Sequence, residues 1–433
     1  MIRQTIREYG RLTTRPVASS LHEAQIPATA FDWLCRLCER EPGLGQLRNQ
    51  TTLQWKSFVG VLRTPCGLEL EIVPKTQQEA ATAKDCRELL VRMLSKVLDM
   101  PFREIGEAEI RLFSLLLTEW VARQFLLRLH RLLQHGLRCE YQRVEEKQTC
   151  LRGQLDVRRQ VCQLPHRRHL FHVRHDVFNL DRQENRLLQS ALRVVAASVR
   201  DAENWRLAAA ARPLLADIPL SRDIQGDFVL WRHNRLMAAY DAVRPWCELV
   251  LGNGMPRAIA GQQTGISLLF PMHDLFERYV AISLRERLVP GARLETQPGG
   301  RFLCTQEERN RFALRPDIVV RYGEQKWILD TKWKLLDCED SENGISIQDV
   351  YQLFAYGQQW LGGQGDVLLV YPGHVAFPGS VPPLYYRNSS LKLTVATFDL
   401  ATDALLCAPD AATLLPWLKP TPPQRLNKNT ACT

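Results

Sequence analysis

The sequence has no long apolar run, and this absence limits where the protein can reside. No stretch of the 433 residues approaches the roughly 18 consecutive apolar residues that span a membrane. The first eight residues, Met1 to Glu8, contain no apolar segment of the kind found in a secretory signal. These two absences favour a cytoplasmic protein without a membrane partner.

A phosphate-binding loop is also missing. The pattern G-x-x-x-x-G-K-S/T, whose backbone amides and lysine hold nucleotide phosphates, occurs nowhere in the chain. Any nucleotide hydrolysis that accompanies the function would therefore come from another subunit.

Cysteines are present, but paired cysteine motifs are scarce. The 12 cysteines are scattered, and only Cys35 and Cys38 have the spacing of metal ligands. No second pair accompanies them, and the apolar stretch 31–40 is predicted to be helical. We therefore expect two reduced cysteines on one helix face rather than zinc ligands.

Histidine recurs at every third residue in one short segment, a spacing that fits neither a strand face nor a clean helix face. Two interpretations are open: a Zn²⁺ site, or a basic strand and loop near DNA or a partner. The second is favoured, because nearby Cys162 and Asp176 form no recognisable ligand pattern with these histidines. The four residues are His166, His169, His172 and His175.

The composition describes an ordinary globular protein with a basic surface. Hydrophobic residues make up 45% of the chain and charged residues 24%, and the length predicts two or three domains. The formal net charge of +9 favours a polyanionic partner such as nucleic acid.

The segment from Arg315 to Tyr356 carries the most specific chemistry. Apolar runs at 318–322 and 327–330 flank Gly323-Glu324 and predict a β-hairpin. If these two residues form a type II′ turn, in which Gly supplies the positive φ, residue i pairs with residue 647 minus i. Asp317 then lies opposite Asp330, with Cβ atoms roughly 4.5–5.5 Å apart. Lys332 points to the same face as Asp330.

Two carboxylates this close would repel each other unless a cation lies between them. Oxygen ligands with room for water favour Mg²⁺, with Mn²⁺ as an alternative. Such a site, with Lys332 orienting water or neutralising charge on phosphate, predicts phosphodiester hydrolysis. The alternative is a surface hairpin with solvated acids and an ordinary salt bridge. The burial expected for Asp330 at the end of an apolar strand argues against that alternative.

Two predicted helices flank the hairpin. The helix from Met272 to Leu288 carries Glu277, which is either a further metal ligand or a solvated acid paired with a neighbouring Arg. The helix from Ile347 to Trp360 places Gln352 and Tyr356 one turn apart on one face. Beside a cleft, these two side chains could hold the DNA backbone or orient Lys332.

Helix, hairpin, helix and the strand 367–371 make an α/β core. This arrangement resembles the PD-(D/E)xK nuclease superfamily, and Gln352 with Tyr356 matches the Q-x-x-x-Y helix of its RecB-like members. The resemblance implies that Glu277 is the first acid, Asp317 the second, and Asp330 the third with Lys332. It also implies that Glu277, Asp317 and Asp330 bind the metal.

Motifs outside this segment resemble the McrC family over about residues 55 to 375. The resemblance implies the nuclease subunit of a type IV, McrBC-like restriction system that cuts double-stranded DNA containing methylated cytosine. It further implies a hexameric McrB-like AAA+ ring that hydrolyses GTP, a GTPase that this subunit stimulates. The matching segments are Leu70–Lys75, Gly136-Leu137 with Tyr141, Leu151–Leu155, Asp181–Asn185, and Phe270–Met272 with Leu275–Tyr279.

We therefore expect an α+β N-terminal region followed by an α/β restriction-endonuclease-like domain of the PD-(D/E)xK class. The expected parts are a partner-interaction region at 1–150, a mainly helical region at 151–255, a nuclease domain at 256–418 and a disordered tail at 419–433. Two other functions stay open: a RecB-like repair nuclease, and a non-catalytic adaptor that binds the ring and DNA.

Overall fold

The computed structural model describes most of the chain. It covers residues 3–75, 82–97, 117–167, 169–232, 237–251, 268–336, 340, 342–373, 381–406 and 415–419. The apolar pattern predicts a helix at 107–134, and its start lies outside the described residues. The predicted tail, except for Lys419, also lies outside them.

The described residues group into two compact units, which the chain visits in turn. One contains the described parts of 60–69 and 114–269, and the other those of 2–59, 70–113 and 270–433. The four-part division expected from sequence stays a prediction.

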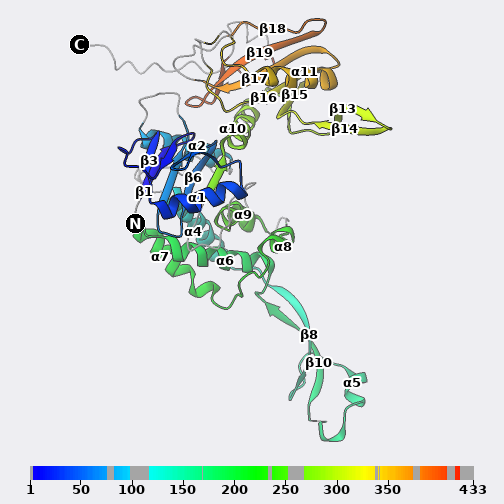
Figure 1. The fold of residues 1–433 in the computed structure, drawn as a ribbon. Coiled ribbons are helices and arrows are strands. Elements are labelled where there is room, and N and C mark those ends of the chain that lie inside the picture. Colours follow the sequence, from blue (N-terminus) through cyan, green and yellow to red (C-terminus); the bar gives the residue numbers. More distant parts are fainter. Residues whose placement is uncertain are drawn as a thin grey trace, which may run out of the picture. The chain divides into compact units, whose positions relative to one another are not determined.

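The first unit consists mainly of helices and a long ribbon (Figure 1). Helix α4 packs against α9 and α7, and the rings of Trp120 and Trp246 meet edge to face with centroids 5.4 Å apart. The sequence pattern predicts one helix at 185–203, but the structure divides it in two, because Asp201 caps a new helix by accepting hydrogen bonds from the backbone N–H of Glu203 and Asn204. The helices are α4 (Leu117–His135), α5 (Val157–Val161), α6 (Gln183–Ser198), α7 (Ala202–Ala211), α8 (Ile224–Val229) and α9 (Ala238–Val250), with 3₁₀ turns at Pro165–Arg167 and Pro213–Leu215.

The ribbon of this unit is a three-stranded sheet of order β8-β10-β9. Its antiparallel strands β8 and β10 pair from Glu140↔Asn179 to Gln148↔Phe171. The strands are β8 (Glu140–Gln148), β9 (Gln154–Leu155) and β10 (Phe171–Asn179).

Three strands lie where the chain passes between units: β6 (Phe58–Arg63), β7 (Glu69–Val73) and β11 (Leu268–Pro271). Pro65 and Gly67 predict a turn in the sequence, and the structure has this turn between β6 and β7, with the Thr64 backbone N–H donating to the Leu68 carbonyl at 2.9 Å.

The second unit begins with a small sheet of order β3-β2-β5-β4. Its early elements are β1 (Arg3–Arg7), β2 (Arg11–Thr13), β3 (Glu23–Gln25), α1 (Ala28–Arg40), β4 (Gly45–Asn49), β5 (Thr52–Trp55) and α2 (Ala83–Val97). Helix α2 packs against α10 (Met272–Glu286), so residues from both ends of the sequence build this unit.

The larger sheet of the second unit has the order β12-β15-β16-β17-β19-β18, with β20 paired to β19. Strands β15 and β16 are antiparallel, whereas β16–β17 and β17–β19 are parallel. The strands are β12 (Arg293–Thr296), β15 (Ile318–Tyr322), β16 (Gln325–Thr331), β17 (Gln364–Pro372), β18 (Leu384–Tyr385), β19 (Ser390–Asp399) and β20 (Ala404–Leu406).

Helix α11 (Ile347–Leu361) covers one face of this sheet, where Leu353 and Tyr356 pack on Val319, Ile328 and Leu369. The aromatic rings of α10 pack on strand side chains that point to the opposite face of the sheet. The ring centroids of Phe276 and Phe398 are 6.3 Å apart. The separate ribbon of β13 (Arg301–Gln306) and β14 (Arg309–Leu314) leaves the sheet between β12 and β15 (Figure 1).

The fold is therefore mixed α/β with several sheets. The hairpin register is as predicted: Ile318 pairs with Leu329 and Tyr322 with Gln325, both sums being 647. Gly323 supplies the positive φ of the turn, at +60°. The helices predicted at 272–288 and 347–360 are confirmed within two residues.

Candidate active site

The two strand acids lie where β15 begins and β16 ends. The β15–β16 ladder ends at Ile318↔Leu329, so Asp317 and Asp330 occupy the next opposing positions. Asp317 Oδ2 accepts hydrogen bonds from the backbone N–H and the hydroxyl of Thr331, at 2.7 and 2.8 Å. These bonds fix one oxygen of Asp317.

Lys332 lies two residues beyond Asp330 and faces α11. Its Nζ is 2.5 Å from Asp330 Oδ2 and donates to Gln352 Oε1 at 3.1 Å. Asp349 Oδ1 is 3.8 Å from the same nitrogen. Burial acts to lower the pKa of Lys332, but the Asp330 carboxylate outweighs it and the pKa is raised. The lysine is therefore held as a cation.

Hydrogen bonds through Gln352 and Tyr356 connect Lys332 to the backbone before Asp317. Gln352 Nε2 donates to the Tyr356 hydroxyl at 2.7 Å, and that hydroxyl donates to the Arg315 carbonyl at 3.0 Å. In this arrangement the two residues orient Lys332 and the strand start, which is one of the two roles expected from their spacing.

Glu277 projects from α10 and is tied to the same edge of the sheet. Its Oε1 accepts a hydrogen bond from Gln297 Nε2 at 2.9 Å, and the Gln297 backbone N–H donates to the Asp317 carbonyl at 2.8 Å. Burial and the charge of Asp317 raise the pKa of Glu277 to about 7. Glu277 is half-buried, and the two roles expected for it from the sequence stay predictions.

The carboxyl groups are buried together and repel one another. Burial, followed by the charge of Asp317, raises the pKa of Asp330 to about 7, even though Lys332 acts to lower it. Burial also raises the pKa of Asp317. Two coupled acids with raised pKa values in one place are typical of a site that awaits a cation or a proton.

The donor set fits a weakly coordinated Mg²⁺. Asp330 is 1% exposed, and its Oδ1 accepts no hydrogen bond from the described residues. No three His, Cys, Asp or Glu side chains in the described parts of the chain are grouped so that they could hold a metal ion, and this includes Glu277 together with Asp317 and Asp330. Mg²⁺ commonly takes one or two carboxylates, with water and phosphate completing its shell. Metal binding by Asp317, Asp330 and Glu277 stays a prediction.

The structure thus brings all six predicted residues to one edge of the sheet. Sequence reasoning missed Thr331 and Gln297. Thr331 lies between Asp330 and Lys332 and could have been noted as a hydroxyl donor. Gln297 lies 20 residues from both Glu277 and Asp317 in a turn without a motif, so nothing in the sequence marks it.

A buried acid from the N-terminal segment supports the strand end behind Lys332. Glu8 Oε1 accepts hydrogen bonds from Trp333 Nε1 at 2.6 Å and from the Lys75 backbone N–H at 2.9 Å. Burial raises the pKa of Glu8. The residue after the candidate lysine is therefore anchored by residues at the start of the chain.

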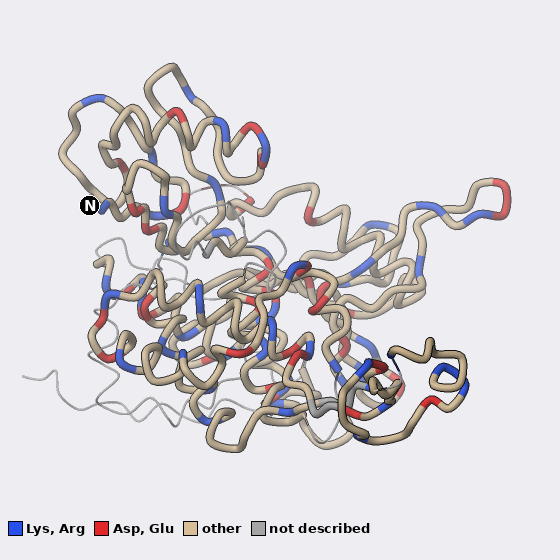
Figure 2. Tube along the Cα trace, turned by 90° about the horizontal axis from the view of Figure 1, so that it is seen from below, with Lys and Arg blue, Asp and Glu red and all other residues tan. Residues whose placement is uncertain are grey.

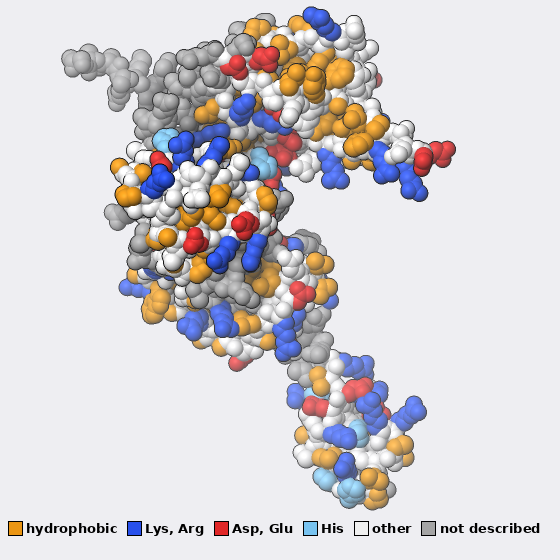
Figure 3. Space-filling model, viewed as in Figure 1, with side chains coloured by type: hydrophobic (Ala, Val, Ile, Leu, Met, Phe, Trp, Pro, Cys, Tyr) orange, Lys and Arg blue, Asp and Glu red, His pale blue; other side chains and the backbone are white. Residues whose placement is uncertain are grey.

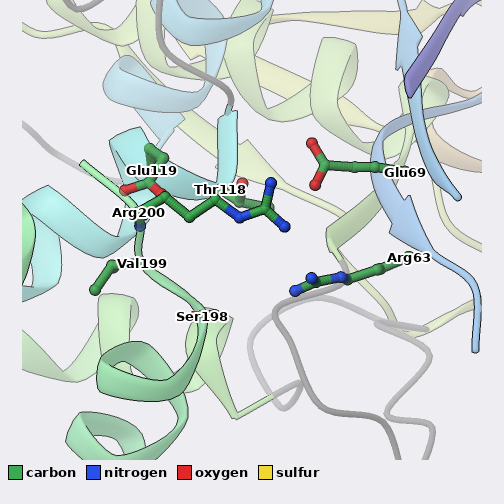
Figure 4. Close-up of a pocket in the computed structure, with 7 residues that line it drawn as sticks. All are labelled: Arg63, Glu69, Thr118, Glu119, Ser198, Val199 and Arg200. Carbon is green, nitrogen blue, oxygen red and sulfur yellow. Dashed lines mark hydrogen bonds between the residues drawn. The ribbon is translucent and has the colours of Figure 1, made fainter. Parts of the chain in front are cut away.

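The first unit contains a small pocket (Figure 4). The side chain of Arg200 points toward that of Glu69, while the Arg200 backbone N–H donates to Glu119 at 2.6 Å. None of the six candidates lines it. Its lining residues are Arg63, Glu69, Thr118, Glu119, Ser198, Val199 and Arg200.

Among the described helices, none has the length and apolarity needed to cross a membrane.

Comparison with known proteins shows that the fold is shared. A solved structure from Thermococcus gammatolerans, a half-complex from a tetradecameric assembly of McrB AAA+ hexamers with bound McrC, has a similar chain. The TM-score is 0.65 at 17% identity, over 92% of this chain and 94% of that one. This likeness shows a shared fold.

A second similar structure is the cryo-EM structure of the Thermococcus gammatolerans McrBC complex, at 18% identity, a TM-score of 0.49, and coverage of 65% of this chain and 87% of that one. No curated protein matches the sequence. The family model described as "McrBC 5-methylcytosine restriction system component" matches residues 53–372. The chain therefore belongs to the family of McrBC 5-methylcytosine restriction system components.

Proposed function

We propose that this chain is the DNA endonuclease subunit of a McrBC-like restriction complex, with a nuclease domain of the PD-(D/E)xK class. The observation that carries the proposal is the Asp330 carboxylate. It is 1% exposed, lies opposite Asp317 and touches Lys332 through one oxygen, while its other oxygen has no described donor. A structural salt bridge has no need of a second buried acid.

Asp317 and Asp330 would hold Mg²⁺ or Mn²⁺, with Glu277 as a further ligand. A bound ion would supply Lewis acidity toward the phosphodiester and lower the pKa of water. Lys332 is placed to hold the attacking water or to neutralise the charge that develops on phosphate, and Gln352 fixes the position of its ammonium at 3.1 Å. Thr331 holds Asp317 Oδ2 through two hydrogen bonds, which leaves Asp317 Oδ1 as the oxygen that would bind the ion.

We further propose that cutting requires a GTP-hydrolysing McrB-like AAA+ ring and that methylated cytosine marks the substrate. Support comes from the family and from the Thermococcus gammatolerans assembly, which contains McrB AAA+ hexamers with bound McrC. The missing phosphate loop is consistent with a motor on another chain.

The test is cleavage of methylated plasmid by the complex reconstituted with its ring protein, GTP and Mg²⁺. Asp330→Asn and Lys332→Ala should each lower the rate by at least about 100-fold, because each removes charge from the reacting centre. Both variants should still stimulate the GTPase. Asp366→Asn is the matched control, because this half-buried acid of the same sheet pairs with Lys392 at 3.8 Å instead.

Retained cutting in either site variant would remove these residues from the chemistry. Loss of GTPase stimulation along with cutting would indicate a folding defect. Circular and linear plasmids, methylated and unmethylated, separate this function from repair-type end processing, since an end-processing nuclease would require the linear form.

A further inference from the structure

The ribbon β13–β14 projects from the edge of the candidate site with no sheet beside it (Figure 1). Its strands, six residues each, pair from Arg301↔Leu314 to Gln306↔Arg309. At about 3.4 Å per residue the ribbon is about 20 Å long. Nearly all of its side chains are exposed, so burial of apolar surface does not explain its presence.

Both ends of the ribbon are fixed to site residues. Before β13, Gln297 donates to Glu277 through its side chain and to the Asp317 carbonyl through its backbone. After β14, the Arg315 carbonyl accepts the Tyr356 hydroxyl at 3.0 Å. A polymer whose backbone reaches Asp317 and Asp330 would therefore pass the base of the ribbon.

The strands of the ribbon carry unpaired positive charge. Arg301, Arg309 and Arg311 are exposed, and none forms an ion pair with a described residue. Arg309 and Arg311 are two residues apart on one strand and point to the same face, opposite Gln306 and Cys304. In Figure 3 the blue side chains lie along the ribbon and the red ones at its tip; Figure 2 gives the same order along the trace.

The ribbon also holds an aromatic side chain in the solvent. Phe312 is 73% exposed, and its backbone has a φ of +57°, the left-handed region that bulky residues rarely adopt. Leu303, on the opposing strand, is 48% exposed. Strained backbone and exposed apolar rings are typical of surfaces that contact another molecule.

We propose that the β13–β14 ribbon is a DNA-binding arm that lies in a groove of the substrate duplex, with Arg309 and Arg311 pairing with phosphates away from the scissile bond. This inference rests on the proposed nuclease function and adds the residues that position its substrate. The major groove of B-form DNA, about 12 Å wide, admits a two-stranded β-ribbon. Arginine binds phosphate through a planar fork of donors.

Charge decides between DNA and a protein as the occupant. Arg309 and Arg311 lie in the outer half of the ribbon, and the base of the ribbon is fixed to the carboxylates that would act on phosphate. A polyanion long enough to reach both is the partner that fits this arrangement. The acidic tip, Glu307 and Glu308, would lie beyond the phosphates, because it would repel them. The arm therefore positions DNA without reading its modification.

The test is binding of a fluorescein-labelled 40-base-pair duplex by the full-length chain in EDTA, over a range of salt concentrations. Arg309→Ala with Arg311→Ala should weaken binding by roughly 10- to 60-fold at 0.1 M salt and reduce the slope of log K against log salt by about two. Glu307→Gln with Glu308→Gln should bind at least as tightly as the unchanged chain.

Arg206→Ala with Arg222→Ala is the matched control, because it removes two exposed arginines from the first unit. Its affinity should equal that of the unchanged chain, and equal unfolding midpoints of all variants would exclude misfolding. Unchanged affinity and slope in the ribbon variant would overturn the inference, as would no measurable binding by the unchanged chain at 50 mM salt. Intact DNA binding with lost GTPase stimulation would assign the ribbon to a protein partner.

Binding in EDTA is independent of cutting. A chain whose arginines control binding but which never cuts DNA would keep the arm and refute the nuclease. A chain that loses cutting through Asp330→Asn, but binds DNA equally well after Arg309→Ala with Arg311→Ala, would keep the nuclease and refute the arm.

Discussion

At the scale of single residues, Asp330 is the acid of the site whose charged form is least favourable. An acid at 1% exposure with a like charge opposite it is stabilised by one lysine contact, and this does not restore an ordinary pKa. The site therefore stores electrostatic free energy in the metal-free protein, and a divalent cation would release it.

This predicts that Asp330→Asn stabilises the metal-free protein in a pH-dependent way. The pKa of Asp330 rises from 3.8 to about 7 on folding, so its contribution to stability is present below pH 3.8 and is lost as the pH rises through 7. The advantage of the Asn variant should grow by roughly 2–3 kcal/mol between pH 5 and pH 8. Urea unfolding in EDTA at several pH values measures it.

Magnesium provides the control for this prediction. Mg²⁺ should raise the unfolding midpoint of the unchanged chain at pH 8 and leave that of the Asn variant almost unchanged. A variant advantage that is the same at pH 5 and pH 8 would show that Asp330 is not destabilised by its charge.

The same residues show how far sequence reasoning can go. Gly323 fixed the turn, the turn fixed the register, and the register placed Asp317 opposite Asp330 without any tertiary information. Gln297 could not be found in this way, because its contact with Glu277 depends on where α10 crosses the sheet edge. Local rules predict strand partners, whereas contacts between elements depend on packing.

At the scale of elements, α11 is the part that connects the core to the site. Its inner face packs Leu353 and Tyr356 on the sheet, and the same turns present Gln352 to Lys332. Amphipathic spacing predicted this helix to within one residue. The ribbon β13–β14 was missed, because exposed strands lack the apolar alternation that marks a strand with one buried face.

Gly357 sets the distance between α11 and strand β19. A Cβ atom there would lie 2.6 Å from Leu391 Cδ1 and 2.8 Å from its Cδ2, and Leu391 is only 1% exposed. Gly357→Val should therefore force the helix outward, destabilise the fold by about 2–3 kcal/mol and lower cleavage by displacing Gln352. Urea unfolding and plasmid cleavage measure both effects.

Gln359→Val is the matched change on the exposed face of the same helix. It adds the same β-branched side chain, so it reports the helix-propensity term alone, which amounts to a few tenths of a kcal/mol. Equal losses in the two variants would mean that packing on Leu391 does not determine the position of the helix.

At the scale of the whole molecule, the larger compact unit is discontinuous in the sequence. Residues 2–59 and 70–113 belong to the same compact unit as 270–433. Arg92 Nη1 donates to the Leu400 carbonyl at 2.7 Å, and Lys96 Nζ lies 2.9 Å from Glu286. Contacts separated by hundreds of residues leave no periodic signal, so sequence patterns alone do not reveal them.

We therefore predict that a fragment of residues 256–433 does not fold on its own. It lacks α2, which packs on α10, and Glu8, whose carboxylate accepts the Trp333 indole N–H at 2.6 Å next to Lys332. Losing these partners exposes the apolar face of α10 and leaves buried donors unsatisfied. Circular dichroism and limited proteolysis should show no cooperative transition in the fragment.

The control is the full-length chain without residues 149–170, the segment between β8 and β10 in the other unit. This variant should keep the unfolding transition of the site-bearing unit and its Mg²⁺-dependent midpoint shift. A cooperatively folded fragment that binds Mg²⁺ would instead establish the nuclease domain as an independent unit.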